Sequence, residues 1–228
     1  MPGTAPARFR PIAFFDVDET LISIKSMFDF YDYFLAAVGH SEQEQRKLHD
    51  AARALLKPGM PRSEGNRLFY RRFAGYKADE VAGIGRQWFA ARLTRGGLFH
   101  TDVLAALRGH ADAGMTTVLV SGSFSACLDP VREHCGADLA MCTQLAVLDG
   151  VYTGEVTRTM IGDAKANLAR ELIAGTGVDA ADCHAYGDHT SDLGLLQLVG
   201  NPVVVGENPD LGAIAATEGW SRLAGIPG

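Results

Sequence analysis

Two carboxylates stand two residues apart near the start of the chain, in the run Asp16-Val-Asp18-Glu-Thr20. In an extended segment such residues share one side, so both acids would face the same space. One carboxylate could attack an electrophile there while the other transfers a proton. Because aspartate is also common in ordinary loops and caps, the pair is informative only in combination with further motifs.

A second polar group is the run Ser121-Gly122-Ser123, which separates an apolar stretch from a helical pattern. A hydroxyl and backbone N–H groups gathered at the start of a helix would hold a phosphate. Ser123 is also suited to be the N-cap residue of a helix that begins at Phe124. The run therefore predicts a phosphate cradle, a helix cap, or both.

Lys165 falls in the first turn of a predicted helix, where the helix dipole disfavours a cation unless an anion offsets it. A solvated surface lysine is the alternative interpretation. Further along, Asp188 and Asp192 follow another apolar run and offer two more carboxylates. Mg²⁺ prefers such oxygen ligands and keeps part of its hydration shell. Together with the first two motifs, these residues indicate a phosphate site beside a site for a divalent cation.

The acidic pair, the serine run and the second pair of acids each follow a short apolar run that is typical of a buried strand. The predicted strands cover residues 12–16, 115–121, 182–187 and 202–205, and the helical patterns cover 101–113, 124–134, 163–174 and 191–199. This alternation favours an α/β fold, a Rossmann-like parallel sheet core with helices on both faces. Because ligands bind at the carboxyl ends of strands in such sheets, the motifs should meet at one edge.

Two regions interrupt this alternation. Residues 22–100 are nearly all helical in pattern, with helices expected at 26–38, 41–56, 64–73 and 78–93. Residues 144–156 form two alternating runs around Asp149-Gly150, which predicts a β-hairpin. The expected domains are a flexible N-terminal arm (1–11), an α/β core (12–21 and 101–228) and a helical cap (22–100).

The composition is that of a globular protein of 228 residues, 47% of them hydrophobic, with a net charge of −6. An acidic chain argues against nucleic-acid binding, and no apolar stretch reaches the length of a membrane span. Residues 22–100 carry 13 Lys and Arg against 8 Asp and Glu, whereas the rest carries 8 against 19, enough acids to hold a cation. We expect a cytoplasmic protein with free cysteines, and its oligomeric state stays open.

In their order, the four motifs resemble those of the haloacid dehalogenase superfamily: Asp16-x-Asp18-x-Thr20, Ser121, Lys165 and Gly187-Asp188-x-x-x-Asp192. The helical segment between the first two motifs is similar to the cap of the phosphoserine phosphatase-like subfamily. The resemblance extends from about Ile12 to Trp220. It implies a magnesium-dependent phosphatase that acts on a small phosphorylated metabolite.

The resemblance also implies roles for the acids. Asp16 would be the nucleophile that forms an aspartyl-phosphate. Asp18 would protonate the leaving alcohol and then deprotonate the water that cleaves the intermediate. Mg²⁺ would bind the side chains of Asp16 and Asp188 and the backbone carbonyl of Asp18, with Asp192 nearby.

Other residues would hold the substrate. The resemblance implies that Thr20, Ser121, Gly122 and Lys165 bind the phosphate. Lys25 departs from the subfamily pattern, because phosphoserine phosphatases have an acid there that receives the substrate's amino group. A lysine would repel an ammonium, so phosphoserine is not the expected substrate.

The helical segment supplies further candidates for substrate binding. Besides Lys25, we take Arg67 and Arg71, because they share one face of a helix and arginine suits carboxylate or phosphate. Asn66 and Tyr70 share another face of the same helix. A solvated basic face is the alternative interpretation of the arginines.

Two other functions stay open. The same aspartyl-phosphate could pass its phosphoryl group to an alcohol acceptor, which would make the protein a phosphotransferase. A non-catalytic phosphate-binding or signalling module, such as a receiver domain, also uses clustered acids, a hydroxyl and a lysine. The long helical segment and the second acid, Asp18, argue against such a module, and the magnesium-type acids argue against dehalogenation.

Overall fold

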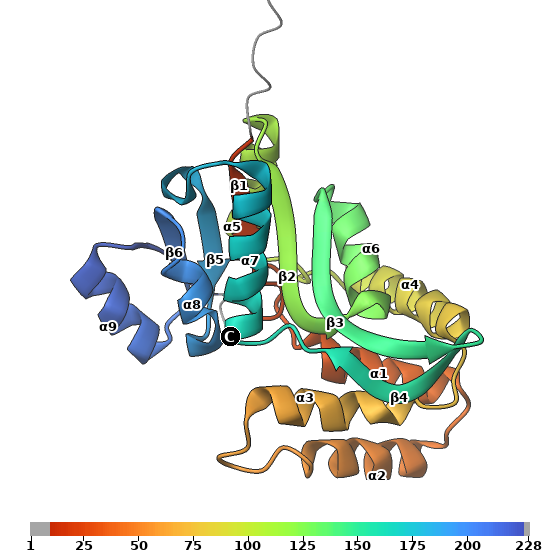
Figure 1. Ribbon diagram of the computed structural model, residues 1–228. Coiled ribbons are helices and arrows are strands. Elements are labelled where there is room, and N and C mark those ends of the chain that lie inside the picture. The colour runs from red at the N-terminus through yellow and green to blue at the C-terminus, as the bar shows by residue number, and fades with distance from the viewer. Residues whose placement is uncertain (1–9, 226–228) are drawn as a thin grey trace, which may run out of the picture.

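The computed structural model describes residues 10–225, which form one seven-stranded sheet with helices on both faces (Figure 1). The strands are β1 Ile12–Phe15, β2 Thr116–Phe124, β3 Leu139–Leu148, β4 Val151–Arg158, β5 His184–Gly187, β6 Asn201–Val205 and β7 Ser221–Leu223. Their order is β4-β3-β2-β1-β5-β6-β7. Neighbouring strands are parallel except β3 and β4, which form the predicted hairpin. The α/β prediction is confirmed, whereas the expected arm at 1–11 lies almost entirely outside the described residues.

The segment between β1 and β2 begins with four helices, α1 Ser26–Ala37, α2 Glu42–Arg53, α3 Arg62–Tyr70 and α4 Ala78–Arg95. The helices that follow are α5 Thr101–Asp112, α6 Ser125–Cys135, α7 Asp163–Thr176, α8 Leu193–Leu196 and α9 Pro209–Glu218. Sequence patterns did not predict α9 or β7. In the described residues no helix has both the length and the apolar character needed to cross a membrane.

One local prediction was wrong, because Ser123 does not cap a helix. Strand β2 continues past Ser121 to Phe124, and α6 begins at Ser125 without a side-chain cap. The hydroxyl of Ser123 is instead buried and lies 2.8 Å from the hydroxyl of Ser26. The serine run is therefore the end of a strand rather than the start of a helix.

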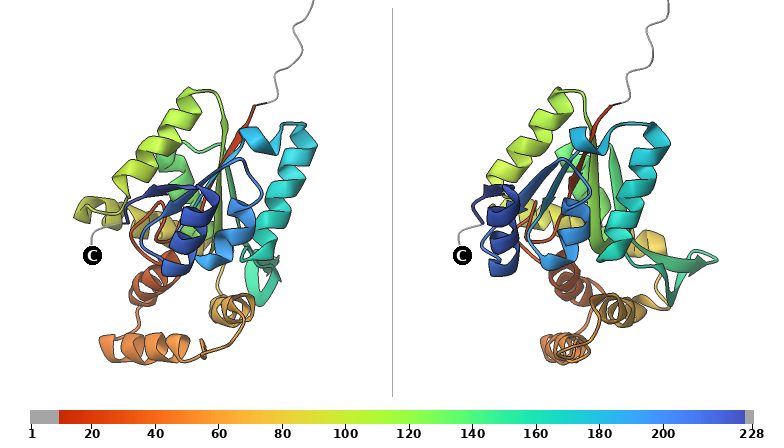
Figure 2. Two further views of the ribbon diagram at one scale, coloured as in Figure 1. Left: turned by 90° about the vertical axis from the view of Figure 1, so that its left-hand side faces the viewer. Right: turned by 60° about the vertical axis from the view of Figure 1, so that its left-hand side comes forward.

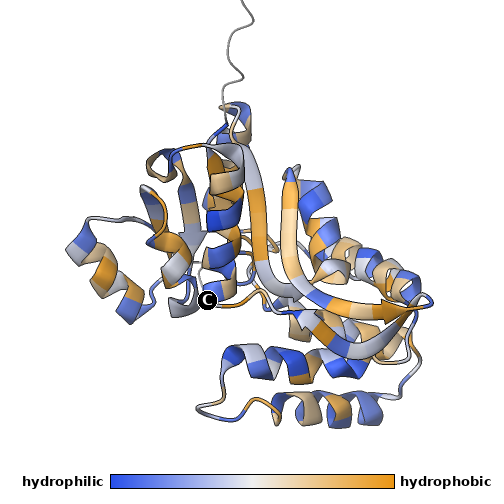
Figure 3. Ribbon diagram, in the orientation of Figure 1, coloured by the Kyte–Doolittle hydropathy of each residue, from blue (hydrophilic) through white to orange (hydrophobic). Residues whose placement is uncertain are grey.

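Helices α5 and α6 cover one face of the sheet, and α7, α8 and α9 cover the other (Figure 2). Because side chains alternate along a strand, Phe15 packs with the first group and Phe14 with the second. All four residues of β1 are buried, which explains its unbroken apolar run. Figure 3 shows a similar hydrophobic stretch in the middle of β2. The core thus fixes β1 in the middle of the sheet, with its carboxyl end at the edge where the motifs lie.

The chain leaves the core to form the helical segment and returns to the core at the same place. Ile22 pairs with Phe99 in an antiparallel bridge, directly after the motif loop that follows β1. Helices α1, α2 and α3 lie beyond one end of the sheet, where β4 of the hairpin contacts α3 (Figure 1). The N–H of Gly75 donates to the carbonyl of Tyr152 at 2.9 Å, and the N–H of Tyr152 donates to that of Tyr76 at 2.9 Å. The hairpin therefore holds the helical segment to the core.

Aromatic packing fixes α1 and α3 over the end of β2. The ring of Phe124 lies 4.9 Å from those of Tyr70 and Phe73 and 5.6 Å from that of Phe30. Each such pair contributes about 0.5–1.5 kcal/mol beyond the burial of its surface. The cluster places the inner face of α3 next to the serine run of β2.

Gly85 allows α4 to pack directly against α6. A Cβ at this position would lie 2.0 Å from the carbonyl oxygen of Ala126, so a side chain must force the helices apart. We expect Gly85→Ala to lower the free energy of unfolding by about 1–3 kcal/mol, the usual cost of overpacking. Urea titration of the variant and the wild type measures this difference.

Gly83→Ala is the matched control on the same helix. A Cβ there would meet no atom nearer than 3.9 Å. Alanine is about 0.5–1 kcal/mol more favourable than glycine inside a helix, so this variant should be slightly more stable than the wild type. Equal losses in both variants would contradict the close contact between α4 and α6.

Candidate active site

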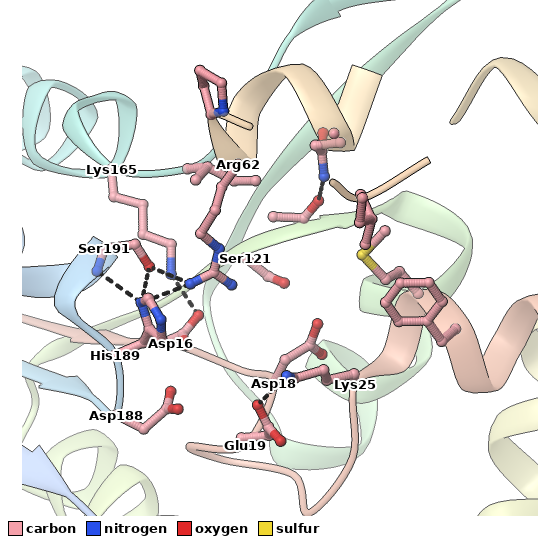
Figure 4. A pocket seen from close by; sticks show the side chains of 18 of the residues that line it. Asp16, Asp18, Glu19, Lys25, Arg62, Ser121, Lys165, Asp188, His189 and Ser191 are labelled. Carbon is pink, nitrogen blue, oxygen red and sulfur yellow. Dashed lines mark hydrogen bonds and ion pairs between the residues drawn. The ribbon is translucent and has the colours of Figure 1, made fainter. Parts of the chain in front are cut away.

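The carboxyl ends of β1, β2 and β5 bring the sequence motifs to one cavity of about 400 Å³ (Figure 4). Six of the motif residues line it, namely Asp16, Asp18, Ser121, Gly122, Lys165 and Asp188. Thr20 and Asp192 are fully buried behind this lining. Residues that are far apart in the sequence therefore share one site, because parallel strands deliver them to the same edge of the sheet.

The side chain of Lys165 lies between two carboxylates. Its Nζ donates to Oδ1 of Asp16 and to Oδ1 of Asp192, both at 2.6 Å, and all three residues are buried. Burial lowers the pKa of Lys165, but the two carboxylates outweigh it and raise that pKa above its ordinary value. These anions offset the unfavourable helix dipole in the first turn of α7. Lys165 is thus a buried, paired cation that lines the cavity and not a solvated surface residue.

A third carboxylate, that of Asp188, lies beside these two. Oxygen atoms of Asp16, Asp188 and Asp192 lie within 4.8 Å of one another. The hydroxyl of Thr20 donates to Oδ1 of Asp188 at 2.7 Å and so orients that carboxylate. Burial raises the pKa of each of the three acids, which means that their charges are poorly compensated. An all-oxygen donor set with excess negative charge fits a hard divalent cation.

Asp18 lies in a different environment from Asp16. Its Oδ1 accepts a hydrogen bond from the backbone N–H of Ser26 at 3.2 Å. Burial raises the pKa of Asp18 to about 7. The hydrogen bonds from Ser26 lower this pKa in part, and the repulsion of the Asp16 carboxylate raises it further. A carboxyl group with such a pKa can both give and take a proton near neutral pH.

The motif loop turns sharply at Glu19, whose φ is 62°. This left-handed conformation costs a non-glycine residue about 1–2 kcal/mol. The N–H groups of Leu21 and Ile22 both donate to the carbonyl of Val17 at 2.9 Å, which stabilises the turn. The Glu19 carboxylate pairs with Lys25 at 3.2 Å, and both side chains line the cavity.

Helix α3 does not turn its predicted arginine face towards the cavity. Neither Arg67 nor Arg71 lines it: Arg67 donates to the carbonyl of Val156, and Arg71 is exposed. The face with Asn66 and Tyr70 is buried instead, and Asn66 lines the cavity. The aromatic cluster decides this orientation, and its partners come from distant parts of the chain.

Arg62 and His189 also line the cavity, although neither is among the predicted site residues. Arg62 Nη1 lies 2.7 Å from His189 Nδ1 and donates to Ser191 Oγ at 3.1 Å. Burial and then the charge of Arg62 lower the pKa of His189. Its Nδ1 is an acceptor, because the guanidinium of Arg62 and the N–H of Ser191 both donate to it. These contacts join the first turn of α3 to the loop that carries Asp188 (Figure 4). Adjacency of His189 to Asp188 was the one sequence signal for its position.

The helical segment also contributes an apolar wall and three cations. The apolar residues are Met27, Phe28, Leu56, Met60 and Pro61. The cations are Lys25, Lys57 and Arg62. Among the residues that line the cavity, Glu19 is the acid outside the motif carboxylates. This part of the cavity suits an apolar group or an anion better than an ammonium.

Comparison with known proteins identifies the family. The sequence model of the haloacid dehalogenase-like hydrolases matches residues 13–197. The chain belongs to this family. It is 32% identical over 225 residues to a probable phosphatase of Mycobacterium tuberculosis. The aligned region covers 97% of this chain and 77% of that relative. The resemblance inferred from the four motifs is therefore confirmed.

Solved structures show the same fold. A protein of unknown function from Bordetella pertussis Tohama I has a TM-score of 0.81 at 25% identity, and the match covers 94% of this chain and 98% of that one. A phospho-aspartyl intermediate analogue of phosphoserine phosphatase has a TM-score of 0.65 at 16% identity, with 95% and 94% covered. Family and motifs make the protein a phosphoric monoester hydrolase of the phosphoserine phosphatase-like type.

Lys165→Met tests whether the buried ammonium holds the carboxylate cluster of this hydrolase together. Without it Asp16 and Asp192 lose their shared cation, and breaking a buried pair costs about 3–5 kcal/mol. We expect a loss of that size in the free energy of unfolding, measured by urea titration without metal. Lys77→Met removes an exposed pair with Glu80 and should change the free energy of unfolding far less than Lys165→Met. Similar small losses in both variants would contradict the structural role of Lys165.

Proposed function

We propose that this hydrolase cleaves a small phosphomonoester through an aspartyl-phosphate on Asp16, with Mg²⁺ in the carboxylate cluster. The observation that carries the proposal is the difference between two acids in one cavity. Burial raises the pKa of both acids, but Asp16 shares a 2.6 Å ion pair with Lys165, which favours its ionised form. Asp18 has no such partner and a pKa of about 7, so it can carry a proton. A nucleophile and a general acid need this separation of properties.

The reaction has two steps. In the first, an oxygen of Asp16 attacks phosphorus, the bond from phosphorus to the alcohol oxygen breaks, and Asp18 gives its proton to that oxygen. In the second, water attacks the phosphorus of the aspartyl-phosphate and Asp18 takes the water proton. The bond from phosphorus to Asp16 then breaks, which restores both side chains and releases inorganic phosphate.

The phosphoryl oxygens are held by the Ser121 hydroxyl, the Gly122 N–H and the Lys165 ammonium. Glycine suits position 122, because a Cβ there would lie 2.9 Å from Cγ1 of Ile161 and force that side chain to move. Thr20 supports this arrangement from behind through Asp188 rather than by lining the cavity.

The side chains of Asp16 and Asp188 and the carbonyl of Asp18 would hold Mg²⁺, with Asp192 close by. When bound, the ion supplies positive charge that lets an anionic phosphate approach an anionic carboxylate. The excess of carboxylates over ammonium groups in the cluster supports this assignment.

The alcohol part of the substrate would lie against residues 22–100, which we propose to act as a cap over a core of residues 12–21 and 101–228. The apolar wall favours an alcohol with an apolar portion. Lys25, Lys57 and Arg62 make a free ammonium unfavourable, so phosphoserine is not the proposed substrate. Arg67 and Arg71, outside the cavity, are not part of the proposal.

A panel of phosphorylated metabolites tests this function directly. We expect release of inorganic phosphate with Mg²⁺, none with a chelator, and recovery when Mg²⁺ is restored. Asp16→Asn should lower kcat by about 10⁴-fold or more, as loss of a nucleophile does. Compounds with an apolar alcohol should exceed phosphoserine in kcat/KM. Phosphorylation of an added alcohol in place of phosphate release would instead favour a phosphotransferase, and no turnover would favour a binding module.

The role of Asp18 predicts a dependence on the leaving group. Protonation matters for an alkyl alkoxide and much less for p-nitrophenolate, which leaves without a proton. In single turnovers, Asp18→Asn should slow cleavage of an alkyl phosphate by about 10²–10⁴-fold, the usual share of general acid catalysis. Cleavage of p-nitrophenyl phosphate in the same step should slow far less. Equal losses with both substrates would contradict the assignment of Asp18 as the acid.

A further inference from the structure

Two buried side chains donate to a single carbonyl beside the phosphate site. Asn66 Nδ2 lies 2.7 Å from the carbonyl oxygen of Gly122, and Thr143 Oγ1 lies 2.8 Å from it. Both side chains are almost fully buried. A carbonyl oxygen has two lone pairs, so these donors fill its capacity. The opposite orientation of the Asn66 amide would place two acceptor oxygens 2.7 Å apart, so the contact fixes the amide nitrogen towards Gly122.

Thr143 is itself held in place. It accepts a hydrogen bond from the N–H of Met160 at 3.2 Å and lies 3.2 Å from Oδ1 of Asn66. A hydroxyl has one proton, and the shorter contact directs it to the Gly122 carbonyl. The carbonyl therefore accepts one hydrogen bond from Thr143 of the core and one from Asn66 of helix α3.

The other end of the same peptide group reaches Ser121. The N–H of Ser123 donates to Ser121 Oγ at 3.0 Å. Because the peptide bond is planar, fixing the Gly122 carbonyl also fixes the direction of the Ser123 N–H. This N–H occupies a lone pair of Ser121 Oγ, which leaves the hydroxyl proton to point elsewhere. Ser121 lines the cavity, so its hydroxyl is set up to donate into it.

The backbone freedom of Gly122 makes these two hydrogen bonds necessary. A Cβ at position 122 would force the side chain of Ile161 to move, and glycine has more backbone freedom than any other residue. Without partners the Gly122–Ser123 peptide could rotate at little cost and release Ser121 Oγ. The two donors remove that freedom at the point where phosphate is held.

We propose that Asn66 is a positioning residue for the hydrolysis: through the Gly122–Ser123 peptide, it holds the Ser121 hydroxyl as a donor to the phosphoryl group, with Thr143 as its partner. The inference rests on the proposed function. Asn66 comes from α3, so the phosphate site is complete only while this helix is packed on the core. One turn later, Tyr70 lies 3.4 Å from the Ser123 hydroxyl, which ties the same helix face to the same strand.

The first test compares kcat and KM for p-nitrophenyl phosphate with Mg²⁺. Asn66→Ala should lower kcat about tenfold with KM changed less than about twofold, the pattern of an interaction that strengthens in the transition state. Thr143→Val should behave similarly, whereas Thr143→Ser keeps the hydroxyl and should stay near the wild type. Ser63→Ala, on the same helix but outside the cavity lining, should leave both constants unchanged. A change in KM with unchanged kcat in Asn66→Ala would overturn the proposal. A tenfold loss of kcat in Ser63→Ala would do the same.

A double-mutant cycle separates positioning from a general structural effect. If Asn66 acts through Ser121, then Asn66→Ala should cost less than about twofold in kcat when Ser121→Ala is already present. The same tenfold loss in both backgrounds would show that Asn66 acts independently of Ser121 and would overturn the proposal.

Amide hydrogen exchange tests, without any turnover, whether these two hydrogen bonds hold the Gly122–Ser123 peptide in place. The Ser123 N–H should exchange at least about tenfold faster in Asn66→Ala and in Thr143→Val than in the wild type, because local opening becomes easier. The amide of Leu119, in the middle of β2, is the reference and should not change. Unchanged exchange at Ser123 in both variants would overturn the proposal. A wild type without phosphatase turnover would instead count against the proposed function alone.

Discussion

The ammonium of Lys165 between Asp16 and Asp192 is the interaction on which the rest of the site depends. Several carboxylates must lie together in a buried place, and their repulsion would open the site without a cation. The doubly wound sheet makes the arrangement feasible, because β1 and β5 end side by side and α7 places Lys165 against both. The residual negative charge then makes the cluster a natural place for a divalent cation.

The core and the helical segment both line the cavity: the core supplies the motif residues, and the helical segment supplies an apolar wall and three cations. Aromatic packing around Phe124 fixes α3. This helix then contributes both a hydrogen bond to the carbonyl of Gly122 and part of the cavity wall. The same helix contacts His189 in the loop that carries Asp188. One packing interface therefore contacts both the carboxyl end of β2 and the loop that carries Asp188.

The parts of this account that the sequence predicted are those written in local patterns. The apolar run of β1, the Asp149–Gly150 hairpin and the order of the motifs need only neighbouring residues to be recognised. The face that α3 turns inward was not predictable in this way, because Phe124 selects it from far along the chain through its contact with Tyr70. The extension of β2 past Ser121 was missed because its polar residues are satisfied by tertiary partners such as Ser26. Strand β7 has three residues, too few for a periodic pattern.

The most direct test of the central claim is to locate the phosphoryl group during turnover. The protein would be mixed with a phosphomonoester labelled at phosphorus, quenched in acid, reduced with borohydride and mapped by mass spectrometry. The account predicts label on the protein after the acid quench and conversion of Asp16 to homoserine after reduction. Release of labelled phosphate without any modification of Asp16, or with modification of another residue, would contradict it.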